Sequence, residues 1–349
     1  MISRDSYRQI DLYAPDRSPC ATDLSDNTNL WGVPPHAARA VREAHASAVT
    51  RYPSLYAAEL KGALAKAAGV SADMVVTGCG SDDVLDSAIR AFTEPGDRVA
   101  VPHPSFAMIP IFARMNGLEP VLVPLSNGTA LDADAMLATA ARVIYLCSPN
   151  NPTGNLLDAG EVARVVREAP GVVIVDEAYV DFADADALDL LDSSDRLLIC
   201  RTMSKAYGLA GLRMGYALGA PALVAEVEKS RGPYKVNALA ERAALAALRE
   251  DGPWVREHVA EAVANRERLA DELRAREIEP LPSAANFLLA PVPDAADMAA
   301  LLRARGVAVR PFVDLPAIGD ALRISVGPWE MMQAFLDAFD DASGEVACS

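Results

Sequence analysis

Short apolar runs alternate with helical stretches between residues 70 and 220. Several of these runs are apolar at successive positions instead of at every second position. A strand shows this pattern when both of its faces are buried, as in a parallel sheet that is covered by helices. The alternation of strands and helices therefore predicts an α/β fold. The predicted strands are Met74–Thr77, Arg98–Val101, Pro120–Val123, Val143–Cys147, Val172–Val175 and Leu197–Arg201.

The segments on either side of this region follow other patterns. The first 30 residues are polar and contain prolines, which is typical of an arm. Alanine-rich helical patterns follow at Pro34–Val49 and at 54–68, where Ser54 is the expected N-cap and Gly69 the expected end. A long helical stretch at about 235–275 precedes three strand candidates and predicts a smaller α+β domain. The candidates are Phe287–Ala290, Val307–Arg310 and Ala321–Val326.

These patterns divide the chain into three parts. We expect an N-terminal arm at residues 1–30, a large domain at 31–235 and a small C-terminal domain at 236–349. A length of 349 residues is consistent with about two domains. Hydrophobic residues make up 51% of the chain, which is too much for a disordered protein.

Charge and cysteine content exclude several classes of function. The 32 basic and 48 acidic residues give a net charge of −16, so DNA, RNA or an anionic membrane would be repelled by most of the surface. A bound anion must be held locally, by a few cations and backbone N–H groups. The five cysteines contain no C-x-x-C pair and the four histidines have no metal-ligand spacing, so we expect neither a disulfide framework nor a metal. With no signal peptide and no apolar run near the roughly 20 residues that span a bilayer, we expect a cytosolic protein.

The segment after the first predicted strand has the composition of a phosphate-binding turn. It reads Gly78-Cys79-Gly80-Ser81-Asp82-Asp83 and opens a predicted helix. Two glycines let the backbone approach a ligand closely, Ser81 can cap the helix, and the N–H groups at a helix N-terminus can face a phosphate. A plain capped turn explains the segment equally well when it is considered alone.

Polar side chains also follow three other predicted strands. They lie in Ser148–Gly154, in Asp176–Tyr179 and in Thr202–Lys205, with Arg213 farther along. Ligands bind beyond the carboxyl ends of the strands in open α/β sheets, so we expect these side chains to converge on one crevice. One chemistry uses this set. A lysine forms a Schiff base with an aldehyde cofactor, an aspartate keeps the ring nitrogen protonated, and a helix N-terminus with Ser and Arg holds the phosphate.

With these residues the chain resembles the fold-type I pyridoxal phosphate (PLP) aminotransferases of class I/II, and among them the histidinol-phosphate aminotransferases most. The resemblance implies an aspartate aminotransferase-like fold, in which helices sandwich a mostly parallel seven-stranded sheet and a smaller α+β domain follows. It also implies amino transfer from histidinol phosphate to 2-oxoglutarate in amino acid biosynthesis, which yields imidazole acetol phosphate and glutamate. The matching stretches are R-Y-P at 51–53, G-S-D-D at 80–83, P-S-F at 104–106, S-P-N-N-P-T-G at 148–154, V-D-E-A-Y at 175–179, T-M-S-K-A-Y-G-L-A-G-L-R-M-G-Y at 202–216, A-N-F at 285–287 and L-R-I-S-V-G at 322–327.

The resemblance implies the catalytic roles. Lys205 would form the Schiff base with PLP and then move the proton, with a pKa that the nearby Arg213 helps to lower. Asp176 would pair with the ring nitrogen, and Asn151 and Tyr179 would hydrogen-bond the ring hydroxyl oxygen.

The same resemblance implies how the rest of the cofactor is held. Phe106 would stack on the ring. Tyr52 of the partner subunit would reach the phosphate, which makes the enzyme a homodimer with shared active sites. The other phosphate-binding residues would be Gly80, Ser81, Asp82, Thr202, Ser204 and Arg213.

Substrate-binding residues follow from the resemblance as well. Arg323 would bind a carboxylate with two parallel hydrogen bonds, a geometry that suits a guanidinium group. Arg310 would lie near the distal group of the substrate, although a surface arginine at a strand end explains it too. Tyr13 would close over the substrate, and Asn29 and Asn151 would line its site.

The chain departs from the family pattern at Thr28, Leu30 and Lys235, where substrate and subunit contacts are made. These departures leave other substrates open. The alternatives are an aromatic or other amino acid aminotransferase, and a decarboxylase-like or oxidase-like PLP enzyme of specialised biosynthesis. A non-catalytic ligand sensor on the same fold is a further class, and the intact Lys205 argues against it.

Overall fold

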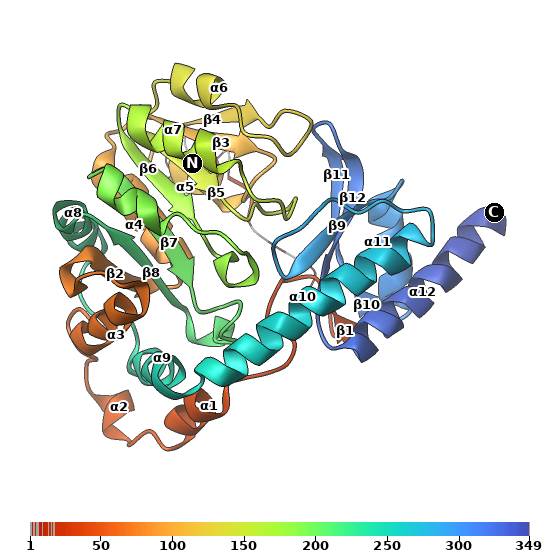
Figure 1. The fold of residues 1–349 in the computed structure, drawn as a ribbon, viewed down its shortest axis with the longest axis horizontal. Coiled ribbons are helices and arrows are strands. Elements are labelled where there is room, and N and C mark those ends of the chain that lie inside the picture. The colour runs from red at the N-terminus through yellow and green to blue at the C-terminus, as the bar shows by residue number, and fades with distance from the viewer. Residues whose placement is uncertain are drawn as a thin grey trace.

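A seven-stranded sheet forms the centre of the larger part of the molecule (Figure 1). The computed structural model describes residues 2, 4, 7, 8, 10–12, 14, 16 and 18–348. The strand order is β2-β8-β7-β6-β5-β3-β4, with β8 antiparallel to both neighbours and the other pairs parallel. The predicted α/β fold and mostly parallel sheet are confirmed. The strands are β2 Val75–Cys79, β3 Arg98–His103, β4 Glu119–Pro124, β5 Val143–Cys147, β6 Val172–Asp176, β7 Leu197–Thr202 and β8 Met214–Gly219.

A layer of helices covers each face of this sheet. Val75 and Ile144 point into a core that is shared with α3, α6, α7 and α9, whereas Val76 and Tyr145 point into a core that is shared with α4, α5 and α8. Burial on both faces is the reason that these strands are apolar at successive positions. The helices are α3 Ala58–Ala68, α4 Ser81–Phe92, α5 Met108–Met115, α6 Ala133–Ala138, α7 Ala159–Glu168, α8 Pro221–Arg231 and α9 Ala238–Glu250, with short 3₁₀ turns at Ala72–Met74, Val180–Phe182, Leu188–Ser193 and Ala210–Leu212.

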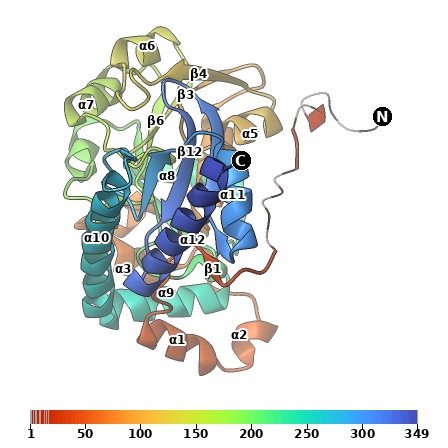
Figure 2. The ribbon, with the colours of Figure 1, turned by 90° about the vertical axis from the view of Figure 1, so that its right-hand side faces the viewer.

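A smaller antiparallel sheet, in the order β11-β12-β9, forms the C-terminal part together with three helices (Figure 2). Leu288 and Ile324 of this sheet share a core with Leu269, Leu302 and Phe335 of the helices. The arm reaches this part, because its strand β1 pairs with β10 in parallel. The elements are β1 Thr22–Asp23, α10 Gly252–Arg274, β9 Phe287–Pro291, α11 Ala295–Ala304, β10 Val307–Ala308, β11 Arg310–Leu315, β12 Gly319–Ser325 and α12 Trp329–Cys348.

The ends of the first helices differ from the prediction. The expected helix at Pro34–Val49 is two helices, α1 Pro35–Arg42 and α2 Ser47–Thr50. Ser54 is not an N-cap, because α3 begins only at Ala58. Its hydroxyl donates to the Glu241 carboxylate on α9 at 2.7 Å instead. The Ser54 side chain, which the local sequence predicts as a helix cap, thus makes a tertiary hydrogen bond instead.

The helical stretch at 235–275 consists of α9 and α10, which meet at Asp251. The backbone N–H of Ala37 donates to the buried Asp251 carboxylate at 2.9 Å, which ties this corner to α1. Ala240 and Ala244 of α9 lie in the core of the large sheet. The domain division stays a proposal, and this packing favours a boundary after α9 instead of at residue 235.

In the described part of the chain, no helix combines the length and the apolar composition that a bilayer crossing requires. The cytosolic location expected from the sequence stays a prediction.

Gly215 of β8 lies directly against the first turn of α4. A Cβ atom at this position would lie 2.2 Å from the Ser81 nitrogen, so a side chain must push the helix start away. We expect Gly215→Ala to lower the free energy of unfolding by about 1–3 kcal/mol, the usual cost of overpacking.

Gly62 is the matched control for this substitution, because a Cβ atom there meets nothing within 4 Å. Gly62→Ala, inside α3, should raise stability by about 0.5–1 kcal/mol. Urea unfolding of both variants measures the two changes. If both substitutions changed the free energy of unfolding by the same amount, the contact between Gly215 and α4 would be unimportant for stability.

Candidate active site

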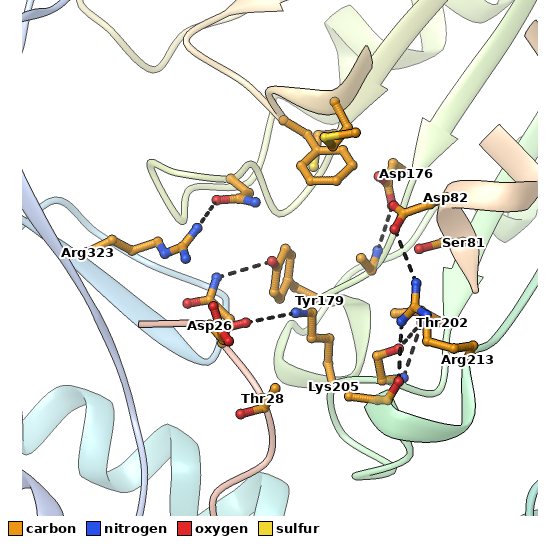
Figure 3. A pocket seen from close by; sticks show the side chains of 18 of the residues that line it. Asp26, Thr28, Ser81, Asp82, Asp176, Tyr179, Thr202, Lys205, Arg213 and Arg323 are labelled. Carbon is orange, nitrogen blue, oxygen red and sulfur yellow. Dashed lines mark hydrogen bonds and ion pairs between the residues drawn. The ribbon is translucent and has the colours of Figure 1, made fainter. Parts of the chain in front are cut away.

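A cavity of about 630 Å³ lies at the carboxyl ends of β5, β6 and β7 (Figure 3). This is the edge of a parallel sheet at which ligands bind. The start of α4, the arm and the small sheet complete its wall. The lining residues are Asp26, Asn27, Thr28, Ser81, Asp82, Phe106, Met108, Cys147, Asn151, Asp176, Ala178, Tyr179, Thr202, Ser204, Lys205, Ala210, Gly211, Arg213, Arg310 and Arg323.

Asp176 is the last residue of β6, and its carboxyl group is buried. The Tyr145 hydroxyl donates to Oδ2 at 2.7 Å, and the Ala178 N–H donates to Oδ1 at 3.1 Å. Burial raises the pKa of Asp176 to about 6, against the opposing effect of these two hydrogen bonds. The carboxyl group is therefore held in one orientation and takes up a proton more readily than an exposed aspartate.

Lys205 lies beyond the end of β7, and its Nζ donates to the Asp26 carbonyl oxygen at 3.3 Å (Figure 3). Desolvation lowers the pKa of Lys205 to about 8, and the positive charge of Arg323 is the next largest cause. Arg213, which the sequence reasoning named, has a smaller effect in the same direction. The amine is consequently neutral in a larger fraction of molecules near neutral pH than an ordinary lysine, and the neutral form is the one that a nucleophile requires.

The first turn of α4 and the loop after β7 form a cup of hydrogen-bond donors. We define this phosphate cup as Ser81, Asp82, Thr202, Ser204 and Arg213. The Thr202 hydroxyl donates to the Ser204 hydroxyl at 3.0 Å, and Arg213 Nη2 donates to the Asp82 carboxylate at 3.2 Å. A helix N-terminus, three hydroxyl groups and a guanidinium group are the donors that proteins use for phosphate.

The backbone of this cup leaves room for an anion but not for extra side chains. Gly80 has a φ of +83°, and a Cβ atom there would lie 2.5 Å from Arg213 Nη2. The expectation that Ser81 caps α4 is wrong, since the helix starts at Ser81 and, in the described part of the chain, no side chain caps it. The first N–H groups of α4 are thus left to a ligand.

Arg323 of β12 determines the orientation of Asn151. Its Nη1 donates to Asn151 Oδ1 at 2.7 Å, and its Nη2 donates to the Ser25 carbonyl oxygen at 2.7 Å. Because a guanidinium group only donates, the amide oxygen of Asn151 must face it and the amide NH₂ must face elsewhere. Asn151 can therefore donate to a ligand while Arg323 stays anchored.

Tyr179 is positioned by the arm. Asn27 Nδ2 donates to the Tyr179 hydroxyl oxygen at 3.2 Å, and the Tyr179 ring lies 5.4 Å from Lys205 Nζ. Burial raises the pKa of Tyr179 to about 12, so the hydroxyl keeps its proton and can donate it to a ligand. Arg310 Nη2 lies 3.6 Å from the Asp26 carboxylate at the other end of the cavity.

Most residues predicted for the site line the cavity, and a few do not. Asn29 holds the arm instead, through Ala206 O at 2.9 Å and the Trp31 N–H at 2.9 Å. Tyr52 is exposed and stacks on Tyr234. Tyr13 lies outside the described residues.

The residues at the departures from the family pattern have different surroundings. Thr28 lines the cavity. Lys235 pairs with the Asp83 carboxylate at 3.4 Å, and Leu30 packs against Gly327 and the small core. Of these three, Thr28 is thus the one placed to contact a substrate within a single chain.

Sequence reasoning did not find Asp26, Asn27 or Tyr145. Asp26 and Asn27 belong to a segment that reads as a polar arm, and Tyr145 lies inside a run that reads as core. No local sequence pattern distinguishes Asn27, because its φ of +54°, which asparagine adopts more readily than most residues, is seen only in the structure.

The model of the family described as "Aminotransferase class I and II" matches residues 20–339 of the chain. The chain belongs to this aminotransferase family. A histidinol-phosphate aminotransferase of Methylibium petroleiphilum is 43% identical over 82% of this chain and 79% of its own length. Histidinol-phosphate aminotransferase 2 of Cupriavidus pinatubonensis is 39% identical over 97% of this chain and 95% of its own length.

A solved structure agrees with this assignment. The histidinol-phosphate aminotransferase of Sinorhizobium meliloti, in complex with pyridoxal-5′-phosphate, has a TM-score of 0.86 and 26% identity, and the match covers 99% of this chain and 98% of that one. Family membership confirms the transaminase and the aminotransferase fold expected from the sequence, and it implies PLP as the cofactor. The phosphate cup, the buried carboxylate and the amine of low pKa fit that molecule.

The influence of Arg323 on this aminotransferase's Lys205 can be measured directly. Arg323→Gln removes a nearby positive charge, so the pKa of Lys205 should rise from about 8 toward the ordinary value of 10.5. The neutral fraction at a given pH then falls, and labelling of Lys205 by acetic anhydride should reach its midpoint at a higher pH. Mass spectrometry of the cofactor-free protein, with the exposed Lys66 as internal reference, measures this midpoint.

Arg213→Gln serves as the matched control for the same measurement. Its effect on the pKa of Lys205 should have the same sign and be smaller, because Arg213 influences this pKa less than Arg323 and Asp82 do. An equal or larger shift in Arg213→Gln would contradict the order of influence that the structure indicates.

Proposed function

We propose that this chain is a PLP-dependent histidinol-phosphate aminotransferase, which transfers the amino group of histidinol phosphate to 2-oxoglutarate. The observation that carries the proposal is the convergence of Lys205, Asp176 and the phosphate cup on one cavity whose far wall presents Arg310 and Arg323. The names of the curated relatives support the choice of substrate.

PLP, when bound, supplies an electron sink that stabilises negative charge on the substrate α-carbon. The chain's own groups do the rest. Lys205 would hold the cofactor through Nζ, and its amine would carry the proton at the substrate α-carbon. Asp176 would keep a proton on the ring nitrogen by its negative charge. Asn151 and Tyr179 would donate hydrogen bonds to the ring hydroxyl oxygen, and Phe106 would cover a ring face.

The far wall of the cavity suits a substrate that carries an anionic group. Histidinol phosphate has no α-carboxylate, so its phosphate can take the place that the carboxylate of glutamate takes in the other half-reaction. Arg323 then serves both substrates. Arg310 adds a second positive charge, which the nearby Asp26 carboxylate partly balances.

A homodimer completes the proposal. Tyr52 is 83% exposed, stacks on Tyr234 with ring centroids 4.8 Å apart, and is surrounded in sequence by the exposed Val49, Leu55 and Tyr56. Exposed apolar side chains in one region are typical of an interface. We infer that this region packs against a second copy and that Tyr52 of the partner subunit reaches the phosphate cup.

The substrate proposal predicts different losses at the two arginines. Arg323→Ala should lower kcat/KM for histidinol phosphate and for glutamate. Arg310→Ala should lower both more than it lowers kcat/KM for a neutral aromatic amino acid. Each loss should be about 10- to 100-fold, the value of one charge-assisted hydrogen bond at about 1.5–3 kcal/mol. Steady-state kinetics of the holoenzyme measure these ratios.

Wild-type enzyme is the control for this comparison, with histidinol as the substrate analogue that lacks the phosphate. If histidinol phosphate were turned over no better than histidinol, the substrate assignment would be wrong, and another amine substrate of the same family chemistry would replace it. The protein with Lys205→Ala should show no turnover with either substrate.

The shared active site predicts complementation between two inactive variants. A dimer of one Tyr52→Ala chain and one Lys205→Ala chain contains a single site with both native residues. Mixing and re-equilibrating the two variants should restore about a quarter of wild-type activity, as expected for random two-fold dimers. Activity of the mixture that equals the mean of the separate variants would contradict the contribution of Tyr52 across the interface.

A further inference from the structure

Tyr145 lies behind the active site and does not line its cavity. It is the central residue of β5, it is wholly buried, and its ring packs in the core between the sheet and helices α4, α5 and α8. In the register of the two parallel strands, Tyr145 is opposite Ile174, and Asp176 is two residues further along β6. Side chains two residues apart on a strand share a face, so Tyr145 and Asp176 are diagonal neighbours.

Packing alone does not account for the hydroxyl group of Tyr145. The ring sits among apolar side chains, where phenylalanine would fill nearly the same volume. The hydroxyl instead donates to Asp176 Oδ2 at 2.7 Å. Burial and the neighbouring Asp176 raise the pKa of Tyr145 well above its usual value, so the hydroxyl stays a donor at every working pH.

The other groups around Asp176 explain why this donor matters. Burial raises the pKa of the carboxyl group, and the negative charges of Asp82 and Glu177 raise it further. The hydrogen bonds from Tyr145 and from the Ala178 N–H lower it. The titratable and charged groups that face Asp176 are Tyr145 and Cys147 of β5, Cys200 of β7, Asp82 of α4, and Glu177, Tyr179 and Lys205 of the loops.

We propose that Tyr145 is a positioning residue of the transamination reaction, which keeps Asp176 ionised and oriented so that the shared proton stays on the ring nitrogen of the cofactor. The inference rests on the proposed binding of PLP and adds a residue that acts through Asp176. Without the hydroxyl, the carboxylate becomes the stronger base of the pair and draws the proton away from the ring. The ring is then a poorer electron sink.

The test compares Tyr145→Phe with wild-type holoenzyme loaded with PLP that is labelled with ¹⁵N in the ring. In wild type, the ¹⁵N chemical shift should be that of a protonated ring nitrogen. In Tyr145→Phe it should move toward the value of a neutral pyridine, and kcat should fall about 10- to 100-fold, the range for losing a hydrogen bond to a charged group. The KM for the amino donor should change by less than about threefold, because substrate contacts are intact.

Two further variants separate the proposed role from a structural one. Tyr216→Phe removes the hydroxyl of another tyrosine, on whose pKa Arg201 and Asp181 act and not Asp176, and it should leave the ¹⁵N shift unchanged. In an Asp176→Asn background, adding Tyr145→Phe should cause no further change in the shift or in kcat, because the charge through which Tyr145 acts is already gone.

The outcomes distinguish the two proposals. If wild-type protein does not bind PLP, the proposed function fails. If wild-type protein binds PLP with a protonated ring but Tyr145→Phe has the same ¹⁵N shift, the role of Tyr145 is refuted and the proposed function stands. The same holds if the effects of Tyr145→Phe and Asp176→Asn are additive.

Should Tyr145→Phe not fold, 3-fluorotyrosine at position 145 replaces it. Its more acidic hydroxyl donates more strongly, so the ring nitrogen should stay protonated as in wild type, and a ¹⁵N shift that moves toward the value of a neutral pyridine would overturn the inference.

Discussion

The negative charge of Asp176 is disfavoured by its place in the fold. The residue ends an interior strand with 3% of its surface exposed, and burial raises its pKa to about 6. A buried carboxylate is normally tolerated only where hydrogen bonds and an opposite charge compensate its desolvation. Here the Tyr145 hydroxyl and the Ala178 N–H supply the hydrogen bonds, and the opposite charge belongs to the protonated ring of the cofactor in the proposed function. In the proposed function, the unfavourable burial of this charge thus favours the binding of a positively charged ring.

Three arginines line the cavity of a chain whose net charge is −16. Arg213 pairs with Asp82, and Arg310 lies beside Asp26. Arg323 donates to the uncharged oxygens of Asn151 and Ser25. Neighbouring carboxylates thus hold two of these guanidinium groups in place. Arg323 and, to a smaller extent, Arg213 also lower the pKa of Lys205, so in the proposed function anion binding and the reactivity of the amine depend on the same charges.

The arm segment 25–27 connects the large sheet with the small one. Ser25 accepts from Arg323 through its carbonyl oxygen, and Asp26 accepts from Lys205 in the same way. Asn27 donates to the Tyr179 hydroxyl with its side chain and to the Ser325 hydroxyl with its backbone N–H, at 2.8 Å. Residues from both parts of the molecule are therefore fixed against a single stretch of backbone, which explains its burial.

The amino-acid sequence by itself determined the α/β fold, the chemistry of the site and most of its side chains. Strands that are buried on both faces must be apolar at successive positions, and polar groups at their carboxyl ends must meet, because parallel strands end at one edge. Motif residues such as Lys205, Asp176 and Arg213 were identifiable for this reason. Strand β8 was not, since Gly215 and Gly219 give it no strand-like pattern and its place between β2 and β7 is set by pairing.

Only the tertiary structure decided which side chains act through another residue. Tyr145 has the sequence pattern of a core residue, and its hydrogen bond to Asp176 exists because β5 and β6 pair in one particular register. The sequence places Asn27 in a polar arm, and only the fold shows that it hydrogen-bonds to Tyr179 and Ser325. The sequence predicts Ser54 as a helix cap, and only the fold shows that Glu241 of α9 lies within hydrogen-bond distance of it. Each of these contacts joins segments that are far apart in the chain or on separate elements, and local pattern carries no information about such distances.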